Sequence, residues 1–355
     1  VIPIGLFDKL FHKAPKEKKF APTLNGWAPI YTSFGSNIYA SDVVQQALKC
    51  IVDELKKLNP THVRYTGSDP VPVRSTIQDI LNEPNPLMTT SEFLEKCSWL
   101  LLMNYNVFII PIYRVWRDEK TGEERRYYEA LYPIQPTTIN FIEDASGKLC
   151  VQFIFANGYD TTLPYENVIH WKYNYSVSQY MGGGWNGAPD HSALLSTLDL
   201  NEKMLQGIAK AMNASYTING VVKYNTLIDD EAMQKNLQEF EAKLNGSQNG
   251  FLPIDLKADF TPLKRDVQLV DADTLKFIDE KILRNWGIPL DILLGDYSKE
   301  TYESFYQRTL EPLIISLSQA LTKKLFTQRE KAFGNRIELY PKELIFLSVQ
   351  QTLEM

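Results

Sequence analysis

The chain has 355 residues, of which 44% are hydrophobic and 12% aromatic, so it can bury a substantial core and is not a disordered protein. Its net charge of −6 argues against a protein whose main task is to grip DNA, because neutralising phosphates requires clustered Lys and Arg. The longest apolar run, 99–103, is far shorter than the roughly 20 residues that span a bilayer, so we expect no transmembrane helix.

The N-terminal segment 1–40 contains several prolines and a cluster of lysines between Lys9 and Lys19. Its basic residues follow its apolar ones, the reverse of the order in a secretory signal, so we expect an extended arm and no signal peptide. The three cysteines are far apart, which argues against a disulfide framework or a zinc ribbon and fits a reducing cytosol.

Helical periodicity dominates the segment 41–104. Ser41 can cap an amphipathic helix that ends at Asn59-Pro60, and a strand at 62–66 and a short helix at 73–81 follow. Thr89 and Glu92 have the spacing of a capping box for a second long helix. From 105 to 171 the pattern becomes alternating and turn-rich, which predicts an antiparallel meander packed on these helices and hence an α+β fold.

The second half of the chain is predicted to hold two long helices around a small mixed unit. The first helix begins near Pro189, and the unit has a strand at 217–224, a helix at 230–244 and strands near 250–254 and 257–262. A helix at 271–286 ends at Gly287 and Pro289, and a loop then leads to a helix with an apolar face from Tyr302 to Leu325. Pro312 is expected to kink that helix, and a final strand covers 336–345.

Two groups of residues could carry chemistry. The sequence GGGWNG at 182–187 matches GxGxxG, but no buried strand leads into it, which favours a connection over a nucleotide site. His170, Asp190 and His191 are the best candidates for a metal or acid–base site, although a half-buried strand position and a first-turn helix position explain them structurally. No signature of a catalytic nucleophile, Walker loop or metalloprotease is present, so we expect a protein that is not an enzyme and has no cofactor.

The stretch NWGIPLDILLGDYSKETYESFYQRTLEPLI resembles the HK97-type portal protein family of tailed bacteriophages. An apolar helix, Gly-Ile-Pro, Leu-Leu-Gly, a Ser/Thr/Tyr-rich stretch and a long helix with Leu-x-Pro follow one another in this segment. Earlier pieces agree in order: the apolar arm, LNEPNPLMTTSEFLEKCSWLLLMNYNVFI, the VIHWKY strand and the Gly-rich loop before a long helix. The similarity covers nearly the whole chain, and the order of the elements carries it.

The resemblance implies a portal-like α+β fold: a mixed α/β wing with antiparallel strands, a two-helix stem, a small α/β clip and a long kinked helix. The implied parts are an N-terminal arm (1–40), wing (41–188), first stem helix (189–214), clip (215–268), second stem helix (269–287), tunnel loop (288–300), kinked helix (301–328), and a return strand with the start of a short or truncated crown (329–355).

The resemblance also implies a homo-oligomeric ring, a dodecamer, at one capsid vertex of the virion, assembled in the host cytoplasm. Double-stranded DNA would pass through it during packaging and ejection. Its other implied partners are the large terminase subunit, the head–tail adaptor and the major capsid or scaffold protein, with no membrane. An acidic chain suits a channel wall that does not grip DNA.

Specific residues follow from this assignment. The tunnel loop that would face DNA comprises Ile292, Leu293, Leu294, Asp296, Tyr297, Ser298 and Lys299. The clip residues that would dock terminase and adaptor are Lys223, Tyr224, Glu239, Lys243 and Asn249, and the helix kink is at Pro312. The alternatives are a soluble metal-dependent hydrolase that uses His170, Asp190 and His191, and another ring protein of virion or tail assembly.

Overall fold

The computed structural model describes residues 21–22, 42–67, 69–117, 124–183, 192–216, 220–224, 234–235, 238, 258–262 and 272–341. The chain divides into two units. The first combines Val1–Leu195 with Ile282–Met355, and the second is Ser196–Lys281. The second unit therefore contains the predicted clip and most of the two predicted stem helices, whose roles as clip and stem stay predictions.

The first half of the first unit contains three helices that the sequence anticipated. They are α2 (Asp42–Leu55), α3 (Thr76–Asn82) and α4 (Thr90–Asn104). The capping box that begins α4 is confirmed, since Thr89 N–H donates to Glu92 Oε2 (2.8 Å) and Glu92 N–H to Thr89 Oγ1 (3.3 Å). Residues of α2 at helical spacing, from Val44 to Leu55, are buried, so its apolar face packs into the core.

The meander that we predicted over 105–171 divides between two sheets, and the described strands of the first unit form three antiparallel sheets in all. Their orders are β12-β2-β3, β5-β4-β9 and β1-β6-β7-β8. The strands are β1 (Ala21–Pro22), β2 (Leu58–Thr66), β3 (Asp69–Pro72), β4 (Asn106–Arg117), β5 (Glu124–Ile134), β6 (Thr138–Glu143), β7 (Leu149–Ile154), β8 (Asp160–Pro164), β9 (Ile169–Lys172) and β12 (Asn335–Pro341).

The meander breaks at two places: β5 and β6 belong to different sheets, and β9 does not continue beside β8. After β8, a 3-10 turn (Tyr165–Asn167) redirects the chain, and β9 pairs with β4 instead of continuing beside β8. Burial explains this choice: Ile169 and Trp171 of β9 are at most 1% exposed, and β4 offers the buried partners Val107 and Ile109. The sheets enclose an aromatic core that includes Phe108, Phe141 and Phe153.

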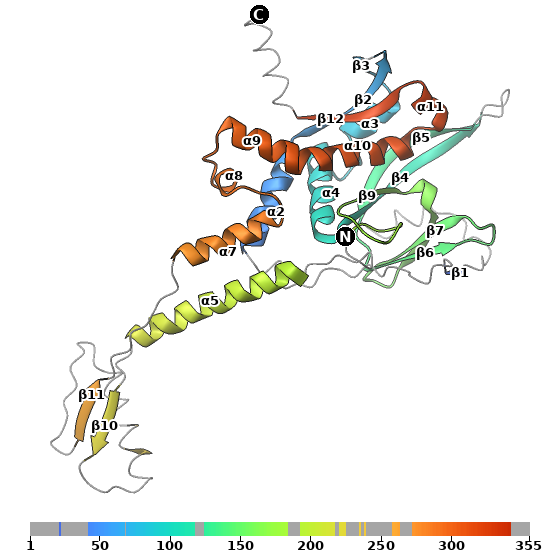
Figure 1. The fold of residues 1–355 in the computed structure, drawn as a ribbon. Helices are drawn as coiled ribbons and strands as arrows, with labels where there is room; N and C mark the ends of the chain where they lie inside the picture. The colour runs from blue at the N-terminus through green and yellow to red at the C-terminus, as the bar shows by residue number, and fades with distance from the viewer. Residues whose placement is uncertain are drawn as a thin grey trace, which may run out of the picture. The chain divides into compact units, whose positions relative to one another are not determined.

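Five helical segments follow near the C-terminus, and of these α10 covers the sheet β5-β4-β9 (Figure 1). They are α8 (Leu290–Leu294), α9 (Lys299–Phe305), a π-helical turn (Tyr306–Leu310), α10 (Glu311–Leu325) and α11 (Gln328–Ala332). On the sheet side of α10, Trp171 Nε1 donates to Ser316 Oγ (2.7 Å) and Tyr128 donates through its hydroxyl to Lys324 O (3.1 Å). Strand β12 lies along another side of α10 and pairs with β2 over seven residues.

The predicted long helix is one continuous helical segment, and its irregularity lies at the π-helical turn 306–310, just before Pro312. Proline at position 312 cannot donate to the carbonyl of Arg308, and its ring crowds the preceding turn. A wider turn at this place accommodates both effects. The kink that we predicted at Pro312 stays a prediction, and the irregularity that the structure shows is the π-helical turn immediately before α10.

The second unit contains α5 (Ser192–Tyr216), which begins in the first unit, the strands β10 (Gly220–Tyr224) and β11 (Ala258–Pro262), and α7 (Ala272–Arg284), which ends in the first unit. Strands β10 and β11 pair antiparallel from Gly220↔Pro262 to Tyr224↔Ala258. This pairing places the predicted strands at 217–224 and 257–262 side by side. The predicted helix cap at Ser41, the helix start at Pro189, the strand near 250–254 and most of the helix 230–244 lie outside the described residues.

The glycines Gly182 and Gly183, which begin the GxGxxG match, are packing residues. A Cβ on Gly182 would lie 2.6 Å from the carbonyl oxygen of Tyr173, and one on Gly183 would lie 2.1 Å from Cδ2 of Tyr105. Gly183 also has φ +77°, a conformation that favours glycine. The close approach of the chain to Tyr105 and Tyr173 explains why both positions hold glycine, and no bound phosphate is needed to account for them.

We predict that Gly183→Ala destabilises the protein more than Gly158→Ala. Both positions have left-handed backbone, at φ +77° and +80°, so each alanine costs about 1–2 kcal/mol of strain. At Gly158 nothing lies within 4 Å, whereas at Gly183 the ring of Tyr105 must move, which adds on the order of 1–3 kcal/mol. Urea unfolding of the two variants measures the difference, and equal losses would contradict the packing role.

Candidate functional site

The segment between α7 and α9 is fixed at its start by buried residues. After α7, Trp286 and Ile288 are 4% and 2% exposed, and Gly287 turns the chain at φ +69°. The hydroxyl of Thr309 donates to the carbonyl of Gly287 (2.9 Å), which ties this turn to the π-helical turn. Gly287 is required here, since a Cβ would lie 2.7 Å from Thr309 Oγ1. The segment therefore leaves the core from a rigid base.

The predicted loop contains a short helix, α8, which we did not anticipate. Ile292 is 9% exposed and packs inward, and Gly295 ends the helix in a left-handed conformation (φ +78°) with its N–H donating to Ile292 O (3.3 Å). The Asp296 N–H donates a hydrogen bond back to Asp291 O (3.1 Å). The sequence signal for this turn, Pro289 before and Gly295 after five helix-forming residues, was present but short.

The end of the segment is fixed by a cap and an aromatic contact. Ser298 accepts from Thr301 N–H (3.2 Å) and so caps α9. The rings of Tyr297 and Tyr302 stack with centroids 5.7 Å apart, and the Tyr302 hydroxyl donates to Glu54 Oε2 of α2 (3.0 Å). Hydrogen bonds at this helix start, from the backbone and from Ser298, lower the pKa of Glu300.

The predicted tunnel-loop residues separate into an inner and an outer group. Ile292 is buried and Leu293 is half-buried, so these two side chains anchor the segment. Leu294 is 69% exposed and Tyr297 47% exposed, which is unusual for large apolar side chains. The remaining predicted residues, Asp296, Ser298 and Lys299, are exposed as well. The segment thus presents exposed apolar side chains beside charged ones on a fixed base.

The predicted clip residues are only partly described. Lys223 and Tyr224 lie on β10, opposite Asp259 and Ala258 of β11. Glu239, Lys243 and Asn249 lie outside the described residues. Their role in docking other proteins stays a prediction.

The rival site around His170 forms a buried hydrogen-bonded cluster. His170 Nδ1 lies 3.0 Å from the Tyr165 hydroxyl and Nε2 lies 3.0 Å from Asn106 Oδ1, while the Phe108 ring stacks on the imidazole at 4.0 Å. Burial, and then the charges of Lys172 and Lys324, hold the pKa of His170 well below its ordinary value. A neutral imidazole with both nitrogens occupied is a structural group.

Nothing described supports a metal at this position. Asp190 and His191 lie outside the described residues, and among the residues that are described no group of three or more His, Cys, Asp or Glu side chains could hold a metal ion. No described helix is long and apolar enough to cross a membrane.

The sequence did not reveal Asn106, which joins the cluster to the Gly-rich connection. Its Oδ1 accepts from Gly182 N–H (2.7 Å), and its Nδ2 donates to Gly182 O and Asn104 O (both 3.0 Å). The only signal was an asparagine at the start of an otherwise apolar strand, which is uninformative without the partner 76 residues away.

The fold is similar to that of chains from gene transfer agent particles and of a phage portal protein. A chain from the neck of an empty gene transfer agent particle, determined with C6 symmetry, has a TM-score of 0.63 at 14% identity, covering 93% of this chain and 91% of that one. A chain from the neck of a native gene transfer agent particle, determined with C12 symmetry, has a TM-score of 0.61 at 15% identity, covering 89% of this chain and 86% of that one. An HK97-family portal protein from Corynebacterium diphtheriae has a TM-score of 0.52 at 12% identity, covering 90% and 98%.

Sequence comparison gives the family directly. The model of the phage portal protein family matches residues 42–355. The chain is 31% identical over 311 residues to proteins described as probable portal proteins from Lactococcus phages p2 and SK1, which covers 86% of this chain and 71% of each relative. The chain therefore belongs to the phage portal protein family, as the resemblance in its sequence implied.

We predict that the stability of the protein falls as the pH drops below 6.5, in part because of His170. The pKa values of His170 and His62 are both lowered by burial, so the folded state binds fewer protons than the unfolded state. The stability that this provides is present above the unfolded pKa of about 6.5 and is lost as the pH falls towards the folded pKa. Each histidine changes the free energy of unfolding by at most about 1.4 kcal/mol per pH unit.

His170→Gln removes one of these groups. The dependence of the unfolding free energy on pH, measured by urea denaturation between pH 7.5 and 5.5, should become shallower in this variant. It should not vanish, because His62 still titrates on unfolding. A slope equal to that of the wild type would contradict a buried neutral His170.

Proposed function

We propose that this protein forms the portal of a tailed bacteriophage: a closed ring at one capsid vertex, through which double-stranded DNA enters and leaves. The observation that carries the proposal is membership of the portal family over residues 42–355. The similarity in fold to a neck chain of a particle determined with C12 symmetry supports a ring of twelve copies in the virion. The protein has a structural role in this proposal and catalyses no reaction.

The segment 288–300 is the proposed channel loop. Its base is held by the buried residues Trp286 and Ile288, and its outer surface presents Leu294 and Tyr297. Apolar side chains offer phosphates no strong binding, so DNA can slide past them, whereas each lysine–phosphate contact would have to be broken at every step. The net charge of −6 agrees with a channel wall of this kind.

The second unit is the proposed stem and clip. Helix α5 carries exposed large apolar side chains at Leu200, Leu205 and Met212, and a single helix gains most of its stability from burying such a face. Packing against neighbouring copies in the ring would bury them. The clip, with Lys223 and Tyr224, would dock the terminase large subunit and then the head–tail adaptor, and the wing would contact the capsid or scaffold protein.

Two other functions are less well supported. A metal-dependent hydrolase would need His170 accessible, but both of its ring nitrogens already have partners and the side chain is buried. Another ring protein of virion or tail assembly shares the ring but needs no exposed apolar loop facing DNA. Metal analysis of the pure protein, and of His170→Ala, tests the first alternative.

We expect end-on electron micrographs of the purified protein to show closed rings with a central channel, and native mass spectrometry to give a defined multiple of the 40.8 kDa chain. Monomers under all conditions would contradict the proposal.

We predict that Leu294→Asp reduces DNA packaging strongly while folding and ring formation are retained. A carboxylate at this exposed position repels phosphates along the channel without disturbing the core, since Leu294 is 69% exposed. DNA protected from nuclease in assembled heads measures packaging, and electron micrographs measure the ring.

Leu87→Asp is the matched control, because it places the same charge at a leucine that is 58% exposed in the turn between α3 and α4. Packaging should be close to that of the wild type in this variant. Equal packaging by Leu294→Asp and the wild type would remove this residue from the channel wall.

A further inference from the structure

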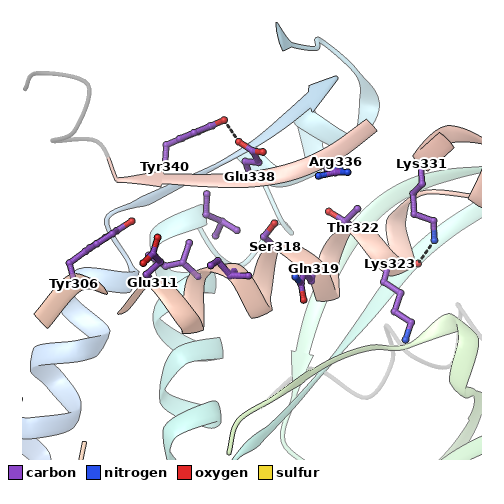
Figure 2. A pocket seen from close by; sticks show the side chains of 13 residues that line it. Tyr306, Glu311, Ser318, Gln319, Thr322, Lys323, Lys331, Arg336, Glu338 and Tyr340 are labelled. Atoms are coloured by element: carbon purple, nitrogen blue, oxygen red, sulfur yellow. Dashed lines mark hydrogen bonds between the residues drawn. The ribbon is translucent and has the colours of Figure 1, made fainter. Parts of the chain in front are cut away.

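Two hollows beside α10 differ in the charge of their walls. The larger, of about 790 Å³, lies between α10 and β12, where Figure 2 shows the carboxylates of Glu311 and Glu338 in the same lining as three cations, Lys323, Lys331 and Arg336. Charges of both signs therefore compensate one another along that surface. The smaller hollow, of about 460 Å³, has charged lining residues of one sign only, and all of them are cations.

We call the smaller hollow the cationic pocket. Three parts of the first unit form it: the end of β9 with the turn after it, the end of α7 with the turn that follows, and the π-helical turn with the start of α10. It is lined by residues 172–174, 284–287, 308–309, 312–313 and 316. No aspartate or glutamate belongs to this lining.

Several polar groups in the wall of the cationic pocket are already paired. The Thr309 hydroxyl donates to Gly287 O (2.9 Å), and the Ser316 hydroxyl donates to Leu313 O (2.8 Å). Arg284 also has an interaction within the chain. These contacts fix the wall, so a ligand would be recognised by the other polar residues that line the pocket.

Four of those residues have N–H groups to offer. Lys172 Nζ donates to Gln179 O (2.8 Å), which uses one of the three protons of the ammonium. Within the described part of the chain, Arg308, Asn174 and Asn285 make no side-chain hydrogen bond or ion pair. An ammonium, a guanidinium and two amides therefore line one hollow with donors that the chain itself does not use.

The electrostatic surroundings of Lys172 favour an anion. The side chain is half-buried, and burial, followed by the charge of Lys323, lowers the pKa of Lys172. The neighbouring charge that acts on this ammonium is thus a second cation. An anion beside Lys172 would offset both the partial loss of water and the repulsion.

A phosphate group fits this set of donors. It presents oxygens on all sides, so it can accept from an ammonium, a guanidinium and amides that belong to different segments, whereas a carboxylate offers only two oxygens in one plane. The volume of the pocket lies in the range that takes small molecules, so a phosphate can enter together with the sugar that carries it.

We propose that the cationic pocket binds a phosphate group, held by Lys172 and Arg308 and by the amides of Asn174 and Asn285. The phosphate comes either from the backbone of DNA or from free phosphate in solution. The DNA source rests on the proposed function, whereas the binding of free phosphate is independent of it.

The cationic pocket adjoins the base of the proposed channel loop and not its exposed surface. Gly287 and Thr309, whose hydrogen bond fixes the start of the segment 288–300, line the pocket, whereas Leu294 and Tyr297 do not. DNA can therefore slide past the apolar surface of the loop while a phosphate is held in the recess beside it. A bound phosphate would also tie β9 to the turn that begins the loop.

Thermal unfolding in sodium phosphate and in sodium chloride of equal ionic strength tests the binding of free phosphate. A ligand that binds the folded state raises Tm, and Arg308→Gln should need about tenfold more phosphate for the same gain, because a hydrogen bond to a charged group is lost. Arg74→Gln, at an exposed arginine outside the pocket, is the matched control and should behave as the wild type. The general stabilisation of proteins by phosphate is common to all variants and cancels in this comparison.

Fluorescence anisotropy of a labelled DNA duplex, measured with assembled rings at several salt concentrations, tests the DNA source. If DNA supplies the phosphate, Arg308→Gln should bind the duplex more weakly than the wild type and Arg74→Gln do. Its affinity should also fall less steeply with salt, because fewer phosphate contacts release counterions.

Lys172→Gln tests the second cation in both assays, and Arg308→Lys, which keeps the charge, should retain a large part of the wild-type response. A change in the phosphate assay alone identifies free phosphate as the ligand, and a change in the duplex assay identifies DNA. If Arg308→Gln and Lys172→Gln both match Arg74→Gln in both assays, the inference is overturned and the proposed portal stands. Absence of rings in the wild type would instead contradict the portal proposal.

Discussion

The first unit depends on the burial of α10 between two sheets. One side of this helix is tied to the sheet β5-β4-β9 by hydrogen bonds from Trp171 and Tyr128. Another side is tied to β12 through Ser318 and Thr322. Because β12 is the edge strand that completes β12-β2-β3, the last strand of the chain and the first strands are held in place through one helix. The position of the proposed channel loop depends on this arrangement.

The proposed channel loop illustrates that dependence. Thr309, in the π-helical turn that precedes α10, bonds to Gly287, and Tyr302 of α9 bonds to Glu54 of α2. Both ends of the segment 288–300 are therefore fixed to the same body, while Leu294 and Tyr297 remain exposed between them. A surface that DNA passes repeatedly needs such a base, because a loose loop could not hold a constant channel width.

Charge bears directly on the proposed channel loop. Its exposed apolar groups, Leu294 and Tyr297, suit a polyanion that must not be held. The net charge of −6 agrees with a wall that does not bind phosphates strongly.

The sequence by itself determined the strongly periodic elements and the family. The face of α2, the Thr89–Glu92 capping box and the segment around 286–312 are local patterns, whose meaning depends on neighbours within a few residues. Helix α11 also had a local signal, the Thr327–Glu330 capping box, which we missed. Only the tertiary structure decided that β9 pairs with β4, that Asn106 bonds to Gly182 and that Ile292 is buried while Leu294 is exposed. These outcomes depend on partners far away in the chain, and pairing across such distances is set by which surfaces the packed core leaves to be covered.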